Sequence, residues 1–396
     1  MTRWAPSGTQ YRTLGWLFLL VMTSIPLAEL AAQTPLGSQN ALAGARVFGL
    51  KGCANCHAIN GVGQTVGPDL AQGRLGSYYG MAAGFWNHFG GMVEVMRSAG
   101  LKPQRMSARQ MEDLIAFFGS VDAFTPPGDA DRGAAVFRGK HCSRCHQVGG
   151  RGGVVGPNLD ALGREGPLRV AAAMWNHGAS MMGTMARLGI ERPTFSATEL
   201  NDLLTFFRRE SPRSRIGPVY LLPGNSDQGR RLMREKNCLE CHAVRGTGAG
   251  LAPDLASRSR AMTLYEFAAT LWNKAPAMLG VMRARGVETP ILAASDMSDI
   301  VAYLYSVRYF RAEGDPATGR RLLATRGCTS CHRAGREGVR QLGEVSDLKS
   351  PASVIAAMWN HSILVFGDQV RPSWPTITAN EMADIVAVFI AQGSTR

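Results

Sequence analysis

The 396-residue sequence predicts an all-α fold made of four tandem units, each of about 85 to 95 residues. Three observations lead to this prediction. The motif C-x-x-C-H occurs four times, and the first cysteines of successive copies are 89, 96 and 90 residues apart. Amphipathic helical patterns recur at matching places in each copy. Strand signals are sparse between them.

Composition and charge narrow the class of protein. Hydrophobic residues make up 45% and charged residues 18% of the chain, which is typical of a packed protein rather than a disordered one. The formal net charge is +13. Basic stripes interleaved with aromatic residues are absent from the sequence, so no nucleic-acid partner is predicted.

The first 32 residues have the pattern of an export signal. Arg3 and Arg12 precede the apolar run from Leu14 to Met22, and small residues including Ala32 follow it. Residues 1–32 are therefore predicted to be a cleaved signal peptide of a periplasmic or otherwise exported protein. An uncleaved membrane anchor is the weaker alternative, because polar residues interrupt a run that would need about 20 apolar residues to span a bilayer.

Each unit begins and ends with a predicted helix. The first helix carries a glycine nine residues before the first cysteine, at Gly44, Gly133, Gly229 and Gly319. The last helices read MEDLIAFF, LNDLLTFF, MSDIVAYL and MADIVAVF, and Ser107, Ser196 and Thr378 are suitable N-caps. In the first of these helices, period-3.6 spacing places Leu114, Phe117 and Phe118 on one face and Asp113 on the other. A Trp-Asn pair precedes each last helix, at residues 86–87, 175–176, 272–273 and 359–360.

Turn-rich segments separate the units. The segments PPGD, RESPRSRIGP and EGDP read as linkers. They predict domains at residues 38–126, 127–213, 224–312 and 313–394. The longest connection, residues 208–224, suggests a division of the chain into two pairs of units at that point. Small helical domains bury little core alone, so something is expected to complete each core.

The C-x-x-C-H motif predicts covalent attachment of haem c. Two thiols on one turn can bond the two vinyl groups of a porphyrin, and the next residue places its imidazole beneath the iron. Zinc sites and thioredoxin-like disulfides need other partners or a βαβ context, which four separate helical units do not offer. The predicted attachment residues are Cys53, Cys56, Cys142, Cys145, Cys238, Cys241, Cys328 and Cys331. The predicted proximal iron ligands are His57, His146, His242 and His332.

With these motifs the chain resembles the class I cytochrome c domain, repeated four times over nearly all of residues 38–394. The resemblance implies four covalently attached haem c groups, each wrapped by one all-α domain whose first and last helices cross at the glycine nine residues before the first cysteine. It also implies that a proline carbonyl of a G-P-x-L segment accepts the second N–H of the proximal histidine. Pro68, Pro157 and Pro253 each lie eleven residues after that histidine.

The sixth iron ligand in units 1 to 3 is predicted to be a methionine. Two methionines follow each tryptophan by six and ten residues, one helical turn apart on a shared face. The second of each pair is slightly favoured, and the choice stays open. The candidates are Met92 and Met96, Met181 and Met185, and Met278 and Met282. His88 and His177 also follow Trp-Asn, but Lys274 stands there in unit 3, so a structural or propionate-side role is expected for them.

The fourth unit departs from this pattern. Val365 and Gln369 occupy the two methionine positions, and Met358 and Met382 align with core residues of the other units. The G-P-x-L segment is matched to VSDL, with Ser346 fourteen residues after the histidine. Two alternatives remain for its iron. Either His361 is the sixth ligand, or the site is open.

These observations predict an exported tetrahaem cytochrome that transfers electrons in a respiratory or similar chain, as a carrier or as a subunit of a larger complex. The alternative is a haem enzyme, a peroxidase or a small-oxyanion reductase, with the divergent fourth haem as active site. Removal of residues 1–32 leaves a charge of +12, which ionised propionates would lower. A basic protein suits redox partner proteins with acidic docking surfaces, including a membrane-bound respiratory complex.

Overall fold

A computed structural model describes residues 40–71, 75–210, 224–257, 262–307, 314–333, 338–345, 348–366 and 374–394. All of these belong to one compact part of the chain, residues 37–396. The predicted signal peptide, Ser346 and Gln369 lie outside the described residues. Among the described helices, none is both long enough and apolar enough to cross a membrane.

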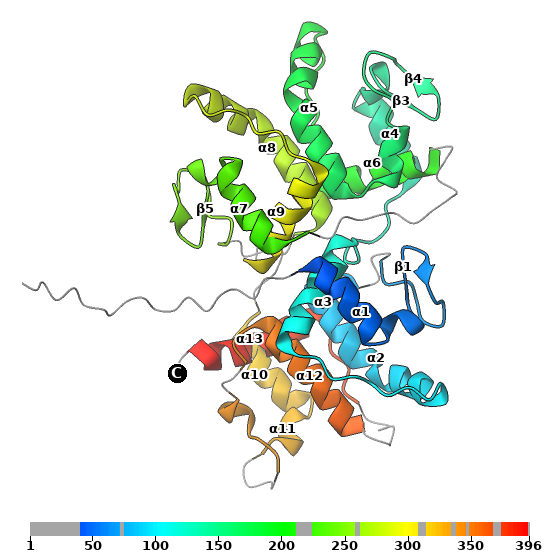
Figure 1. Cartoon of the computed structure of the whole chain (residues 1–396), viewed down its shortest axis with the longest axis vertical. Coiled ribbons are helices and arrows are strands. Elements are labelled where there is room, and N and C mark those ends of the chain that lie inside the picture. Colours follow the sequence, from blue (N-terminus) through cyan, green and yellow to red (C-terminus); the bar gives the residue numbers. More distant parts are fainter. Residues whose placement is uncertain are drawn as a thin grey trace, which may run out of the picture. The chain divides into compact units, whose positions relative to one another are not determined.

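Units 1 to 3 share one order of elements, which Figure 1 shows: a first helix, a short turn at the cysteines, a two-stranded antiparallel ribbon, a long middle helix and a last helix. Unit 1 consists of α1 Ala41–Leu50, η1 Cys53–Asn55, β1 Ala58–Ile59, β2 Val62–Gly63, α2 Tyr78–Ser98 and α3 Ala108–Ser120. Unit 2 consists of α4 Ala130–Gly139, η2 Cys142–Arg144, β3 Gln147–Val148, β4 Arg151–Gly152, η3 Asp160–Arg164, α5 Pro167–Arg187 and α6 Ala197–Glu210.

The second half of the chain repeats this order, with changes in unit 4. Unit 3 consists of α7 Ser226–Glu235, η4 Cys238–Glu240, β5 Ala243–Val244, β6 Thr247–Gly248, α8 Leu264–Ala284 and α9 Ala294–Ser306. Unit 4 consists of α10 Pro316–Thr325, α11 Cys328–Cys331, η5 Leu342–Glu344, α12 Pro351–Phe366 and α13 Ala379–Ser394. The predicted all-α class is confirmed, since the strands are two-residue ribbons.

The first and last helices of every unit cross at the predicted glycine. A methyl group added at Gly133 would lie 2.0 Å from the backbone oxygen of Asp202, so only glycine lets the two backbones approach this closely. The same added atom would lie 1.9 Å from Asp113 O at Gly44, 1.9 Å from Asp299 O at Gly229 and 2.1 Å from Asp384 O at Gly319.

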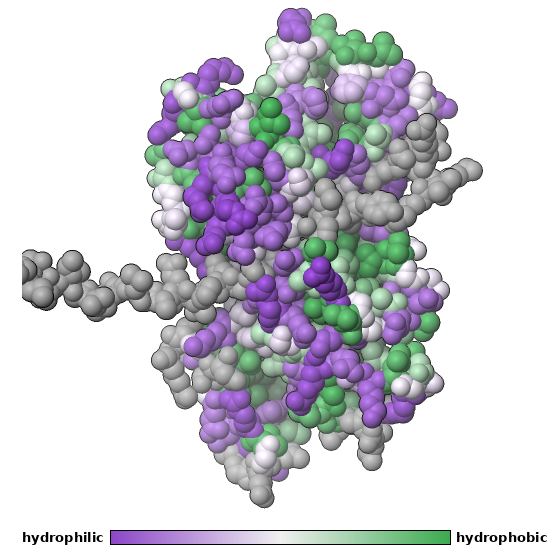
Figure 2. Space-filling model, in the orientation of Figure 1, coloured by the Kyte–Doolittle hydropathy of each residue, from purple (hydrophilic) through white to green (hydrophobic). Residues whose placement is uncertain are grey.

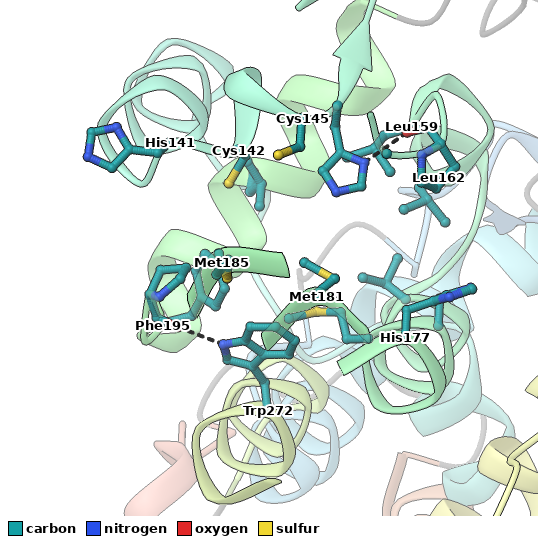
Figure 3. Close-up of a pocket in the computed structure, with 18 of the residues that line it drawn as sticks. His141, Cys142, Cys145, Leu159, Leu162, His177, Met181, Met185, Phe195 and Trp272 are labelled. Atoms are coloured by element: carbon teal, nitrogen blue, oxygen red, sulfur yellow. Dashed lines mark hydrogen bonds between the residues drawn. The ribbon is translucent and has the colours of Figure 1, made fainter. Parts of the chain in front are cut away.

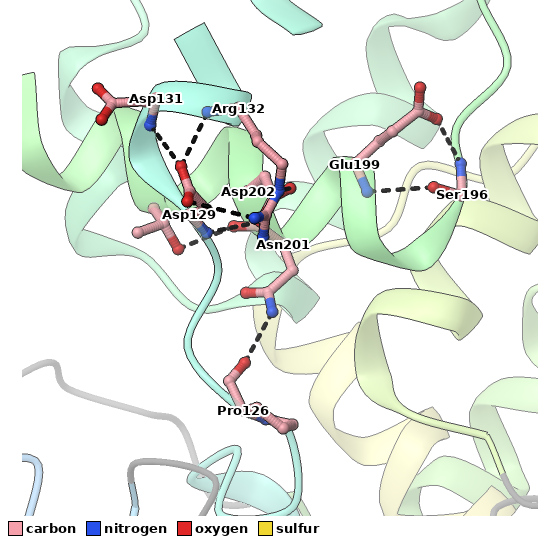
Figure 4. Close-up of polar contacts among 9 residues, drawn as sticks. Pro126, Asp129, Asp131, Arg132, Ser196, Glu199, Asn201 and Asp202 are labelled. Carbon is pink, nitrogen blue, oxygen red and sulfur yellow. Dashed lines mark hydrogen bonds and ion pairs between the residues drawn. The ribbon is translucent and has the colours of Figure 1, made fainter. Parts of the chain in front are cut away.

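The aspartate at this crossing is not on a solvent face, which corrects the expectation for Asp113. Asp113 is only 5% exposed, and its carboxylate accepts a hydrogen bond from Asn40 N at 2.9 Å. The reason is that the first helix begins over this face of α3. Unit 2 repeats the contact, where Asp129 N donates to Asp202 at 2.6 Å and Arg132 Nε donates to the same carboxylate at 2.8 Å (Figure 4).

The predicted N-caps of the last helices are confirmed. Ser107 Oγ accepts from Gln110 N at 3.1 Å, and Ser196 Oγ accepts from Glu199 N at 3.1 Å (Figure 4). Thr378 Oγ1 accepts from Glu381 N at 3.3 Å. Each bond satisfies one of the free N–H groups at a helix start.

The hydrophobic cores show that the units associate in pairs. One cluster joins buried residues of units 1 and 4, such as Leu114 and Ile355, and a second joins units 2 and 3, such as Leu204 and Tyr265. In the 2–3 pair, α5 packs on α8 and α9; in the 1–4 pair, α2 packs on α12 and α13 (Figure 1). The pair partner therefore adds to each small core.

This pairing corrects the expected division at residues 208–224. Two pairs do form, but units 2 and 3, on either side of that connection, belong to the same pair. The apolar faces of the middle helices decide the pairing, and linker length does not reveal which faces match. Tyr305 packs against both clusters, and Ala41 N donates to Gly224 O at 3.4 Å, so the pairs also touch.

Candidate cofactor sites

The cysteine turns place two thiols and an imidazole together in every unit. A residue with left-handed backbone conformation precedes each turn: Gly52, His141, Asn237 and Gly327, with φ of 81°, 60°, 61° and 79°. This sharp bend ends the first helix just before the first cysteine. The histidine amide then donates to the carbonyl of that cysteine, at 2.9 Å for His57 and His146.

The thiols of the first cysteines lie in apolar surroundings. Burial raises the pKa of Cys53, Cys142 and Cys238 to about 11. All eight cysteines are free thiols in the structure, so none forms a disulfide. They remain available for thioether bonds.

The proximal histidines are oriented as the resemblance implied. Nδ1 of His57 lies 2.8 Å from Pro68 O, Nδ1 of His146 lies 2.8 Å from Pro157 O, and Nδ1 of His242 lies 3.0 Å from Pro253 O. When Nδ1–H donates to the carbonyl, Nε2 is left unprotonated as an iron ligand, and the bond fixes the ring and raises its basicity. The role expected for the three prolines is confirmed.

Unit 4 keeps this bond by a different route, which corrects the match to VSDL. Nδ1 of His332 lies 2.8 Å from the carbonyl oxygen of Arg340, eight residues later. Leu342 follows Arg340 by two residues and packs against the core, as Leu70 follows Pro68. The leucine two residues after the accepting carbonyl was the only part of the G-P-x-L pattern present in the sequence at this place. A single leucine is too short a pattern to be recognised without the Gly-Pro before it.

Unit 2 contains an open cavity of about 260 Å³, shown in Figure 3, and Trp272 of unit 3 also lines it. Cys142, Cys145 and His146 line one side. Met181 and Met185 of α5 line the cavity as well, with apolar residues including Val155, Leu159 and Phe207. Both methionine candidates therefore reach the same cavity, and the choice between them stays open. His177 lines the cavity but has an exposed side chain.

These residues fit a covalently bound haem. Two thiols on one turn, an imidazole with a free Nε2 and a facing thioether are the donor set of a c-type site. The largely apolar walls suit a porphyrin. Gly156 lies against the histidine, where an added methyl group would be 2.4 Å from His146 Cε1, so the segment can lie flat on the ring.

The remaining methionines are distributed less uniformly. Met92 is half-buried and packs against Phe89 and Phe366, whereas Met96 is half-buried on the next turn of α2. In unit 3, Met278 is half-buried and Met282 is buried in the core of the 2–3 pair. The two methionines of each of these units therefore lie on one face of the middle helix, and their burial does not decide which of them is the iron ligand.

In unit 4 the structure brings His361 and His332 together. Their ring centroids are 5.5 Å apart with planes inclined by 36°. His361 is half-buried, whereas His88 and His177, at the matching helix positions, are exposed. Burial lowers the pKa of His361, and the nearby His332 adds to the effect. Val365 stands where the other units have their first methionine.

The Trp-Asn pairs join the two units of a pair, a role that the sequence did not reveal. Trp272 Nε1 donates to Pro193 O at 2.7 Å, and Asn273 both donates to Phe195 O at 2.8 Å and accepts from Phe195 N at 3.0 Å. We call this set of three bonds a clasp. A second clasp runs in the opposite direction, because Trp175 and Asn176 of unit 2 make the same hydrogen bonds to the backbones of Pro290 and Leu292 in unit 3.

The 1–4 pair has the same two clasps. Trp86 Nε1 donates to Pro375 O at 2.7 Å, and Trp359 Nε1 donates to Gln104 O at 2.9 Å. Asn87 and Asn360 make the amide bonds to the backbones of Ile377 and Met106. The Trp-Asn pair recurs in all four units although the residue after it varies. This recurrence was the sequence signal that the pair has a common role, which is to join two units.

Comparison with known families matches this architecture. The Cytochrome c family model matches residues 41–122, 130–208 and 226–308, which together exceed half of the chain. The protein therefore belongs to the cytochrome c family, whose domains bind haem c covalently and transfer electrons. The match does not extend to unit 4. Neither the search of curated proteins nor the search of solved structures gave a significant match.

Proposed function

We propose that the chain is an exported tetrahaem c-type cytochrome that carries electrons between redox partner proteins. One observation carries the count of four: unit 4, outside the family match, keeps the cysteine turn and the bond from the proximal histidine to a backbone carbonyl. In each unit the two cysteines would hold the haem and the histidine its iron. The haem would supply one-electron chemistry, and the chain would bind it, orient the ligands and exclude water.

The haem count is the direct test. Intact mass and pyridine haemochrome analysis of exported protein should give four haems per chain. The double variant Cys328→Ser/Cys331→Ser should give three, and the matched variant Cys238→Ser/Cys241→Ser should also give three. A wild-type count of three, unchanged by the unit 4 variant, would overturn the proposal for that unit.

We further assign His361 as the sixth ligand in unit 4. Its ring lies close to that of His332, its counterparts in units 1 and 2 are exposed, and a valine replaces the methionine. A second imidazole on the iron leaves no position for a substrate. The geometry therefore supports an electron carrier over the alternative of a peroxidase or oxyanion reductase at haem four.

Carbon monoxide binding tests this assignment. The reduced wild type should bind none, and His361→Ala should bind one molecule per four haems. His177→Ala, at the matching position of α5, should bind none. Redox titration should also find one centre below the other three, because a methionine ligand raises the potential. Binding of one carbon monoxide by the wild type would show an open site instead.

Charge supports a partner with an acidic docking surface, such as a membrane-bound respiratory complex. Arg230, Arg231 and Arg234 are exposed on α7, shortly before Cys238, and Figure 2 shows hydrophilic residues gathered in that region. Such a surface would attract an acidic partner at low ionic strength. Arg230→Glu/Arg231→Glu should slow electron transfer with an acidic partner, and Arg320→Glu/Arg321→Glu, at the same positions of α10, serves as the matched control.

Export is supported by the pattern of residues 1–32 and by the chemistry of the family. Amino-terminal sequencing of the mature protein should begin close to Gln33. A mature chain that begins at Met1 would contradict cleavage.

A further inference from the structure

We propose that the clasp tryptophans are positioning residues that act across the pair: Trp86 of unit 1 orients His361 of unit 4, and Trp272 of unit 3 closes the ligand side of the cavity in unit 2. Each ligand site is then a composite of two units. For unit 4 the proposal rests on the proposed ligation by His361. For unit 2 it rests only on the cavity and its lining.

The indole ring of Trp86 is nearly parallel to the imidazole of His361. The two rings are stacked, with centroids 6.3 Å apart and planes inclined by 15°. His332 lies 5.5 Å from the same imidazole, and Trp86 belongs to α2 of the other unit. A flat aromatic surface parallel to the ring limits its rotation and so fixes the direction of its nitrogen.

Trp86 is itself held in place by the loop before α13. Its indole N–H donates to Pro375 O at 2.7 Å. Trp374 packs against its ring, with centroids 4.1 Å apart, and Trp374 Nε1 donates to Trp86 O at 2.9 Å. Three contacts from unit 4 thus hold Trp86 of unit 1, two at its indole ring and one at its backbone carbonyl, and the ring in turn stacks with a ligand candidate of unit 4.

The 2–3 pair repeats this arrangement with different residues. Trp272 lines the cavity of unit 2 together with His146 and Met181, although it belongs to α8 of unit 3 (Figure 3). In Figure 3 Trp272 lies across the cavity from Cys142 and Cys145. It is only 2% exposed, and its N–H donates to Pro193 O.

Arg192 takes the place of Trp374 in this pair. Its guanidinium carbon lies 3.9 Å from the centre of the Trp272 ring, and Arg192 precedes Pro193 as Trp374 precedes Pro375. Both pairs therefore place a flat group from the same loop position on the clasp tryptophan. Trp374 and Arg192 are chemically unrelated, yet each packs on the ring of a clasp tryptophan. This repetition supports a role for the position of that ring at the ligand site.

The test compares Trp86→Leu with Trp359→Leu in the full-length protein with haem attached. Both remove the tryptophan bond of one clasp in the 1–4 pair, but Trp359 contacts Phe85 and Phe89 rather than a histidine ligand candidate. We expect Trp86→Leu to change the electron paramagnetic resonance signal of the bis-histidine centre and to raise carbon monoxide binding from zero toward one per four haems. Trp86→Phe should restore the wild-type signal, and Trp359→Leu should leave it unchanged.

Two results would overturn the role of Trp86. One is an unchanged bis-histidine signal in a folded Trp86→Leu protein with four haems. The other is an equal change in Trp359→Leu, which would show that Trp86 acts only through pairing. A wild type without a bis-histidine signal would instead refute the proposed ligation by His361, and the 2–3 pair then decides the inference.

In the 2–3 pair, Trp272→Leu should weaken the charge-transfer band of methionine bound to ferric iron by up to about one third, since one of three such sites is affected. Trp272→Phe should retain the band. A full band in Trp272→Leu, with four haems and wild-type circular dichroism, would overturn the inference for unit 2. If either leucine variant does not fold, Trp86→Gln and Trp272→Gln replace it, because the glutamine amide can keep a hydrogen bond to the proline carbonyl but has no aromatic ring. A change confined to the facing site then supports the proposal, and an unchanged signal and band refute it.

Discussion

Replacement of Gly133 by alanine should separate the two crossing helices of unit 2. The added methyl group would lie 2.0 Å from Asp202 O, 2.5 Å from Asp202 C and 2.8 Å from Phe206 Cβ. Two of these atoms are backbone, so no side-chain rotation relieves the clash. Overpacking costs about 1–3 kcal/mol. The bonds from Asp129 N and Arg132 Nε to Asp202 would weaken as well, at about 1 kcal/mol each. We therefore expect a loss of about 3 kcal/mol in the free energy of unfolding.

Urea unfolding of the full-length protein, followed by circular dichroism, measures this loss. Gly139→Ala is the matched control, because it lies on the same helix and an added methyl group there meets nothing within 4 Å. It should raise the free energy of unfolding by about 0.5–1 kcal/mol, since alanine loses less backbone entropy than glycine. A midpoint for Gly133→Ala at or above that of the wild type would refute the close crossing.

Two further changes test the pairing and the junction between the pairs. Asn273→Ala should lower the free energy of unfolding by about 2–3 kcal/mol, because it leaves the buried N–H and C=O of Phe195 without partners. The control Asn201→Ala loses one exposed hydrogen bond and should lower the free energy of unfolding by less than about 1 kcal/mol. Equal urea midpoints of the two variants would contradict this prediction. Asp122 interacts with Thr125, Tyr265 and Arg208, and burial raises its pKa from 3.8 to about 7. The folded state then binds the proton more tightly than the unfolded state, so the free energy of unfolding should fall by up to about 4 kcal/mol as pH rises from about 4 to about 7. Urea unfolding measured across this pH range tests the fall, which Asp122→Asn should remove.

The features that the sequence predicted correctly are local. The cysteine turn, the bond from histidine to proline and the caps depend on residues within about a dozen positions of one another, and fixed spacing reveals them. Arg340 escaped recognition because a backbone carbonyl needs no particular side chain. Asp113 was misplaced because a helical wheel assumes one buried face, whereas α3 is covered by its own unit and by the partner. The pairing of the units depends on contacts between apolar surfaces that are far apart in the chain. The spacing of residues within a motif does not reveal such contacts.

The nested pairing predicts which pieces of the chain fold alone. Residues 127–307 contain both clasps of the 2–3 pair, since Trp175 reaches Pro290 and Trp272 reaches Pro193 within that piece. Residues 38–213 also contain two units, but the acceptors of Trp86 and Trp175 lie outside them. The first piece buries the shared core, whereas the second exposes the apolar faces of α2 and α5.

We therefore expect residues 127–307, exported with the same signal, to be monomeric, to carry two haems and to unfold in one cooperative transition. Residues 38–213 should aggregate or be degraded, because each unit lacks the partner surface that completes its core. Size-exclusion chromatography, haem analysis and urea unfolding distinguish the two outcomes. If residues 38–213 formed a monomer as stable as residues 127–307, neighbouring units would be able to complete each other's cores, and the specificity attributed to the apolar faces of the middle helices would be wrong.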